Sequence, residues 1–294
     1  MRPRSDLNRP NPTPDFVSSA VNKPIIRHIG NLWTFLDHSW SLDEKLRALK
    51  DAGFDGVCWG GSAELRAGCQ KYGLIFVGGM SSGNAADFPR LLQEQKDCGA
   101  IHVNVQLADD DTLTPKALEL ALALNREGER IGVVPEIETH RDTCTETPEK
   151  HYGLCDAYQE ATGKLLSLSI DFSHFAVVKH LVPENFAKRL LVRPDLIQHA
   201  QQFHFRPFNG HHAQIPVTDG NGNFTRELNE WLPFAEALLQ CWLDGNRNTN
   251  REIFICPELG PVTGGYCLST FPNSWEDKKI LRGEIDRLWR KLTG

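Results

Sequence analysis

The sequence has 294 residues, of which 40% are hydrophobic and 24% charged, and this profile is typical of a soluble globular protein with a large buried core. Its formal net charge is -6, and the charges are scattered along the chain. Neither a nucleic-acid backbone nor an acidic membrane surface would find a basic stripe to bind. The balance therefore argues against nucleic-acid and membrane partners and favours a small-molecule ligand.

The cysteines and the first residues bear on cellular location. The eight cysteines include no CxxC pair, so neither a zinc ribbon nor a thioredoxin-type motif is indicated, and we expect free, mostly buried thiols of a reducing compartment. Residues 1–23 are rich in proline and polar side chains and lack the apolar stretch of a signal peptide, which predicts a flexible tail. No apolar run reaches transmembrane length. A cytoplasmic protein is expected, with one catalytic domain over residues 24–294.

From residue 24 onward, short apolar runs alternate with helical patterns. The first helical pattern, 41–53, begins with Ser41 as N-cap and Glu44 as its capping-box partner, and it stops at Gly53. The predicted strands, each followed by a helical pattern, span 24–30, 54–59, 74–80, 101–107, 131–138, 165–172, 203–208 and 252–259.

Eight strand–helix units are the number in a closed parallel barrel, so the predicted fold is a single (β/α)8 TIM barrel. Several of the strands are near-continuous apolar runs, as expected for strands covered on both faces. An open doubly wound sheet is the alternative. It would need a glycine-rich first turn, and the sequence GNLWTF at 30–35 is a poor match to one.

Acidic and imidazole side chains stand at the ends of the last four predicted strands. They are Glu138, Asp171, His204 and Glu258. Because the carboxyl ends of barrel strands meet at one rim, three carboxylates would repel one another there unless a cation neutralised them. An imidazole with three oxygen ligands suits one divalent ion, with Mn²⁺ the first choice and Co²⁺, Zn²⁺ or Mg²⁺ as alternatives. Four ligands leave coordination positions for water or sugar oxygens.

The stretch GVVPEIETHRDTC at 132–144 places further ionisable groups near this rim. Side chains alternate along a strand, so Glu136, Glu138 and His140 point to one face. Glu136 lies deeper than Glu138, where a lysine or arginine inside the barrel is one candidate partner, and its role stays open. His140 is interpreted as a flanking group that orients a carboxylate or contacts substrate.

These motifs resemble those of the xylose-isomerase-like TIM-barrel superfamily, especially its sugar (phosphate) isomerase and epimerase branch. The resemblance covers about residues 24–292 and rests on Glu-x-His at 138–140, Asp-x-x-His at 171–174, His204 and Glu258. It implies that Glu138, Asp171, His204 and Glu258 hold a catalytic divalent metal, commonly Mn²⁺. It also implies that His174 contacts substrate oxygens. A substrate-binding arginine often follows the seventh-strand histidine, and Arg206 follows here at a closer spacing than usual.

The chemistry implied by the resemblance is proton transfer beside a carbonyl. Glu138 and Glu258 would stand on opposite faces of a sugar or polyol and exchange a proton through an enediolate. Isomerisation or epimerisation is the predicted activity. A lyase or dehydratase on a keto-sugar or inosose-type substrate is the alternative, because the same enolate would expel a β leaving group.

Two further readings are disfavoured by the sequence. A DNA-repair enzyme resembling endonuclease IV would need more histidines and a basic DNA-binding face. A non-catalytic barrel would be expected to have lost at least one member of the Glu, Asp, His and Glu set.

Two loops and three aromatic residues bear on substrate and assembly. The connection 207–226 is long, and a loop of this length serves as a lid, a binding loop, a subunit contact or a plain surface excursion, so a homo-oligomer stays open. The stretch GPVTGGY at 260–266 offers backbone N–H groups for a phosphate, although no lysine or arginine joins it. Trp33, Trp59 and Phe205 offer apolar faces for a sugar ring, with core packing as the alternative.

Overall fold

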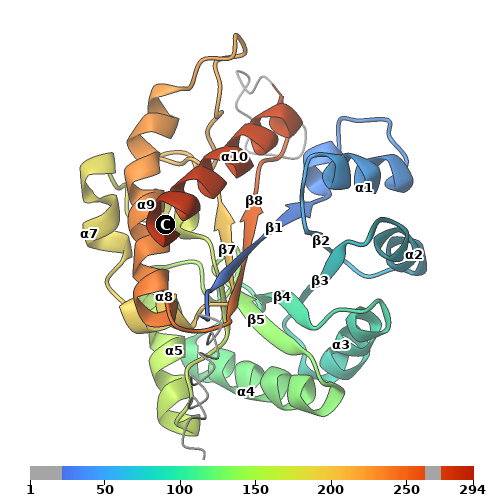
Figure 1. Cartoon of the computed structure of the whole chain (residues 1–294). Coiled ribbons are helices and arrows are strands. Elements are labelled where there is room, and N and C mark those ends of the chain that lie inside the picture. Colours follow the sequence, from blue (N-terminus) through green and yellow to red (C-terminus); the bar gives the residue numbers. More distant parts are fainter. Residues whose placement is uncertain (1–21, 262–272) are drawn as a thin grey trace, which may run out of the picture.

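A computed structural model of the chain describes residues 22–261 and 273–294, and Figure 1 shows its strands enclosed by helices. Eight parallel strands form a closed barrel in sequence order, and β1 pairs with β8 to close it. The predicted (β/α)8 TIM barrel is therefore confirmed. The strands are β1 (Ile25–Asn31), β2 (Gly56–Trp59), β3 (Ile75–Ser82), β4 (His102–Leu107), β5 (Val134–Glu138), β6 (Leu168–Ile170), β7 (Gln202–Phe205) and β8 (Glu252–Pro257).

Helices connect the strands around the outside of the barrel. The predicted capping box of the first helix is present, with the Ser41 side chain accepting from the Glu44 N–H and the Glu44 carboxylate accepting from the Ser41 N–H. The helices are η1 (Trp33–Phe35), α1 (Leu42–Asp51), α2 (Ala63–Tyr72), η2 (Ala85–Asp87), α3 (Phe88–Asp97), α4 (Thr114–Ile131), α5 (Pro148–Thr162), α6 (Phe172–Val178), η3 (Pro183–Asn185), α7 (Phe186–Leu190), α8 (Pro194–His199), α9 (Arg226–Asn246) and α10 (Ser274–Thr293).

Most of the strands are shorter than predicted, and two of them, β6 and β7, end early for identifiable reasons. β6 stops at Ile170 because Asp171 caps α6, with its Oδ1 accepting from the Ser173 N–H at 2.9 Å. β7 stops at Phe205, two residues before Pro207, which has no N–H to donate to a strand ladder. The sequence Asp-x-x-His therefore runs from a strand end into a helix.

The barrel interior has an apolar side and a polar side. The extensive core lies between strands and helices, whereas a small apolar cluster of Ile29, Cys58, Val77 and Phe254 comes from β1, β2, β3 and β8. Buried polar side chains come mainly from β4, β5 and β7 (Asn104, Glu136, Glu138, Gln202 and His204), and Asn31 adds one at the carboxyl end of β1. The polar side leads to the rim on which the predicted site residues stand.

The long connection after β7 is packed against the barrel for much of its length. Residues 213–218 are buried, so the alternative that the connection is a plain surface loop is wrong for this segment. The Asp277 carboxylate in α10 accepts from the backbone N–H groups of Val217 at 2.6 Å and Thr218 at 3.2 Å. Gln214 exchanges two hydrogen bonds with the backbone of Gly260, at 2.8 and 2.9 Å. These contacts fix the connection against the segments after β8 and at the start of α10.

The structure also bears on the predicted tail, the glycine-rich stretch after β8, the cysteines and the predicted lack of membrane-spanning helices. The tail is outside the described residues up to position 21, as is the stretch GPVTGGY from position 262 onward. Within the described ranges every cysteine is a free thiol, and most are buried, as predicted. None of the helices that the structure describes combines the length and the apolar character needed to cross a bilayer.

Candidate active site

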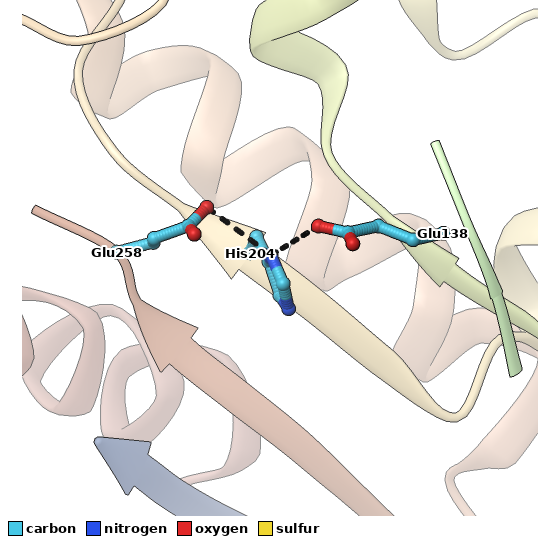
Figure 2. Close-up of side chains that lie close together, drawn as sticks. All are labelled: Glu138, His204 and Glu258. Carbon is cyan, nitrogen blue, oxygen red and sulfur yellow. Dashed lines mark hydrogen bonds and ion pairs between the residues drawn. The ribbon is translucent and has the colours of Figure 1, made fainter. Parts of the chain in front are cut away.

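Three of the predicted site residues meet at the carboxyl end of the barrel. Glu138 ends β5, His204 lies on β7, and Glu258 directly follows β8. Figure 2 shows the His204 imidazole between the two carboxylates, with its Nδ1 at 3.0 Å from Glu138 Oε1 and 3.2 Å from Glu258 Oε2. One donor atom from each residue lies within 4.8 Å of the other two. We call this group the Glu–His–Glu trio.

The charges of the trio are strongly coupled. Burial lowers the pKa of His204, but Glu258 and Glu138 outweigh burial and hold that pKa well above its ordinary value. Burial raises the pKa of Glu258, but Arg206 and His204 hold it well below the usual range, and His204 likewise lowers the pKa of Glu138. Both carboxylates are therefore ionised at neutral pH. The site attracts a cation, either a proton on His204 or a metal ion in its place.

Asp171, the remaining predicted ligand, is turned toward Arg206. Its Oδ2 accepts a hydrogen bond from Arg206 Nη2, and its Oδ1 accepts from the Ser173 N–H. The Arg206 guanidinium also donates to Ser173 Oγ at 3.0 Å and lies 3.2 Å from Glu258 Oε2. Arg206 is 2% exposed. The guanidinium thus links Asp171 to the trio, and the role of Asp171 as a metal ligand stays a prediction.

The rings of the two predicted flanking histidines, His140 and His174, contact each other in a tilted arrangement, with centroids 4.6 Å apart and an interplanar angle of 54°. His174 is buried, and its Nε2 lies 3.0 Å from Arg206 Nη2. Because an arginine only donates, His174 Nε2 accepts this hydrogen bond, and burial together with Arg206 holds the His174 pKa well below its ordinary value. His140 lines the cavity in front of His174. Direct contact of either histidine with a substrate remains a prediction.

A cavity of about 360 Å³ opens onto the trio. Its lining includes the ionic groups Glu138, His204, Arg206 and Glu258 and the apolar side chains Trp33, Trp59 and Met80. Apolar walls with a few convergent polar groups are typical of small-molecule sites. The remaining lining residues are Asn31, Cys58, Gly60, Gly79, Asn104, Gln106, His140, Arg141 and Cys256.

Comparison with known proteins identifies the fold. No family model and no curated protein matches the sequence. Among solved structures, a xylose isomerase-like TIM barrel protein from Mycobacterium smegmatis in complex with magnesium is 15% identical, has a TM-score of 0.55, and matches over 90% of this chain and 97% of that chain. The chain has the xylose isomerase-like TIM-barrel fold.

Two enzymes are also among the similar structures. A D-allulose 3-epimerase from Methylomonas sp. is 14% identical with a TM-score of 0.57, over 91% of this chain and 98% of that chain. The probable 3-DHS dehydratase AsbF from Bacillus anthracis is 14% identical with a TM-score of 0.53, over 89% and 98%. At these identities the likeness establishes the xylose isomerase-like fold alone.

Within this xylose isomerase-like barrel, three amide side chains of the cavity escaped sequence analysis. Asn31 ends β1, and Asn104 and Gln106 face inward from β4. Asn104 Nδ2 donates to Glu138 Oε2 at 2.9 Å and so fixes that carboxylate. The alternation in HVNVQL, which places both amides on the inward face, was the available signal.

Glu136 lies below the trio and contacts His102 Nδ1 at 2.5 Å, rather than the lysine or arginine considered above. Burial raises the pKa of Glu136 more than His102 lowers it. The burial of Glu136 therefore does not require that it bind a metal, because its carboxylate already pairs with His102 at the lower end of the barrel interior.

The donor set of the trio fits a divalent ion. Two carboxylate oxygens and an imidazole nitrogen are ligands that Mn²⁺, Mg²⁺, Co²⁺ and Zn²⁺ accept. Gln202 supports the same conclusion: its amide lies 2.7 Å from His204 Nε2, while its buried Oε1 lacks a partner in the described part of the chain. Rotation of that amide would let Oε1 accept from Nε2–H, which is the outer hydrogen bond that metal-binding histidines usually make.

Proposed function

We propose that the chain is a divalent-metal-dependent sugar isomerase or epimerase that transfers a proton through an enediolate. The observation that carries the proposal is the Glu–His–Glu trio at the end of a cavity of about 360 Å³. Two ionised carboxylates with a cation-binding point between them can hold a polarised substrate and move a proton on it. The likeness to a D-allulose 3-epimerase supports a ketose as substrate.

Glu138, His204 and Glu258 would hold the metal, with Asp171 as the predicted fourth ligand if it exchanges its hydrogen bond to Arg206 for the ion. The bound ion would supply Lewis acidity to adjacent carbonyl and hydroxyl oxygens of the substrate. Mn²⁺ is our first choice, with Co²⁺, Zn²⁺ and Mg²⁺ as alternatives. The magnesium complex of the similar M. smegmatis barrel supports a divalent ion in this fold.

The two glutamates would carry the proton. Glu138 is oriented by Asn104, and Glu258 is oriented by Arg206, so each presents a fixed oxygen toward the cavity. Because both are ionised at neutral pH, either can act as general base toward a C–H beside the carbonyl. Epimerisation follows if the other glutamate returns the proton on the opposite face. Isomerisation follows if one glutamate serves two neighbouring carbons.

The flanking groups would bind the substrate. Arg206 and His140 line the cavity and His174 lies directly behind them, in contact with Arg206. Trp33 and Trp59 would cover the less polar face of the sugar, which is their predicted role and agrees with their place in the cavity wall. A lining that combines charged groups with aromatic rings suits a molecule that has both hydroxyls and C–H surfaces.

A lyase or dehydratase is the second candidate, favoured by the likeness to the probable 3-DHS dehydratase AsbF. Purified protein, loaded with Mn²⁺, would be incubated with a panel of ketohexoses and inososes, and the products identified by mass. A new sugar of unchanged mass supports the isomerase or epimerase, whereas loss of water supports the dehydratase.

Metal content and matched variants complete the test. Elemental analysis should find about one divalent ion per chain, and Glu258→Gln should lose it. Glu276→Gln, an exposed acid of α10 away from the trio, is the matched control and should retain metal and activity. A wild-type protein that neither binds a divalent ion nor changes any of these substrates would refute the proposal.

A further inference from the structure

Lys278 is a fully buried lysine near the start of α10, the helix that lies beside β8 on the outside of the barrel (Figure 1). Lysine is almost never fully buried without a partner, because its ammonium group loses hydration. Its Nζ donates to Asn31 Oδ1 at 2.5 Å, across 247 residues of sequence. Burial lowers the pKa of Lys278 to about 8, so the group still carries its proton at neutral pH.

This contact fixes which end of the Asn31 amide faces the cavity. Thr34 Oγ1 lies 3.2 Å from the same oxygen but also donates to the Leu259 carbonyl, so its one proton leaves the ammonium of Lys278 as the group that decides the orientation. An amide oxygen has two acceptor sites, and an ammonium group only donates, so the oxygen must point toward Lys278. The amide nitrogen consequently points the other way, 3.5 Å from Glu258 Oε1 and along the cavity wall.

We propose that Asn31 donates a hydrogen bond to a substrate oxygen beside Glu258, and that Lys278 is a positioning residue that holds the Asn31 amide in that orientation. The inference rests on the proposed function and deepens it by adding a donor to the substrate site. Neither residue is among those predicted from sequence or implied by the resemblance.

Electrostatics favour the same arrangement. Asp171 and Glu138 are buried carboxylates near the cavity and Glu258 is a partly buried one; Arg206 and His204 face them, and the buried Lys278 ammonium adds a further positive charge on the Glu258 side. A fixed N–H donor backed by an ammonium group stabilises negative charge that develops on a substrate oxygen. An enediolate develops such charge, whereas the ground-state sugar does not. The pair would therefore act mainly on turnover.

A purely structural role for Lys278 would be to anchor α10 to the barrel. Two other residues near the start of this helix already anchor it. Ser274 Oγ donates to the Thr34 carbonyl at 3.1 Å, and Asp277 holds Thr218 through its hydroxyl at 2.7 Å. The next residue, Lys279, is partly exposed and pairs with Glu276 at 2.7 Å. Lys279→Met is therefore a matched control for Lys278→Met.

A double-mutant cycle tests the proposal in the Mn²⁺-loaded protein with a ketohexose that the wild type converts. Lys278→Met should lower kcat by about tenfold to a hundredfold, the effect of one donor aimed at developing charge. Lys279→Met should stay within about twofold of wild type. In the Asn31→Ala background, Lys278→Met should change kcat by no more than about twofold. Lys278→Gln, which keeps an N–H donor, should recover part of the loss. An equal fall of kcat in both backgrounds would overturn the proposal.

A measurement without turnover separates this inference from the proposed function. With [¹⁵N]asparagine labelling, the Asn31 side-chain amide signal is identified by its loss in Asn31→Ala. The signal should move in Lys278→Met and stay in place in Lys279→Met, while Mn²⁺ affinity is unchanged in both. An unmoved signal overturns the positioning role. A moved signal in a protein that converts no ketose would refute the proposed function and leave the Lys278–Asn31 link standing.

Discussion

Replacing Arg206 by methionine removes the cation on which several buried polar groups converge. Its guanidinium contacts Asp171, Glu258, Ser173 and His174. Methionine is unbranched, somewhat shorter and uncharged, so the buried Asp171 carboxylate would keep the Ser173 N–H and the neighbouring His174 Nε2 at 3.4 Å, but no permanent positive charge beside it. Removing one partner of a buried ion pair costs about 3–5 kcal/mol, because the remaining charge is left without compensation.

Urea unfolding of EDTA-treated protein measures this cost. Arg90→Met is the matched control, because Arg90 pairs with Glu94 at 2.7 Å on the surface, where such a pair contributes about 0–1 kcal/mol. Adding Asp171→Asn to Arg206→Met removes the unpaired charge and should recover part of the loss, since the two changes share one interaction. An Arg206→Met protein no less stable than Arg90→Met would refute the assignment of Arg206 as the buried counter-ion.

Three other perturbations have defined outcomes. Asn104→Leu should lower kcat by about tenfold to a hundredfold in steady-state assays, because Glu138 loses a hydrogen bond to a charged group; unchanged kcat would contradict that role. His204→Ala should abolish Mn²⁺ binding in calorimetry, and Asp171→Asn should weaken it as strongly if Asp171 is the predicted fourth ligand; a loss of only about tenfold would instead make Asp171 an outer partner held by Arg206. Burial lowers the pKa of His151 to about 3, so the folded protein binds fewer protons than the unfolded chain below about pH 6.5, and stability falls with decreasing pH. His151→Leu should lessen the stability lost between about pH 7 and pH 5 by about 2 kcal/mol in urea unfolding, and an unchanged loss would contradict a neutral buried imidazole.

The barrel and the trio could be predicted because both follow from local pattern and a general rule. Apolar runs separated by helical patterns indicate strand–helix units, and parallel strands bring their carboxyl ends to one rim. Glu138, His204 and Glu258 stand at such ends, and the structure brings them together. The capping box at Ser41 was equally local, because both of its partners lie within four residues.

The partners of Asp171 and Asn31 could not be predicted in the same way. The contact of Asp171 with Arg206 depends on α6 beginning directly after Asp171 and on the reach of an arginine from the adjacent strand. The contact of Asn31 with Lys278 joins the first strand to the last helix. Neither contact has a periodic signal in the sequence, since each is set by the direction of a long side chain after the barrel has closed.

Hydrogen exchange at the carbon beside the carbonyl tests the central claim most directly. Wild-type protein loaded with Mn²⁺ would be incubated with D-allulose and other ketohexoses in D₂O, and deuterium located by NMR. The account predicts solvent deuterium at that carbon in wild type and its loss in Glu138→Gln and Glu258→Gln. Conversion of a sugar without any solvent deuterium, or exchange that persists in both glutamate variants, would contradict proton transfer by these carboxylates.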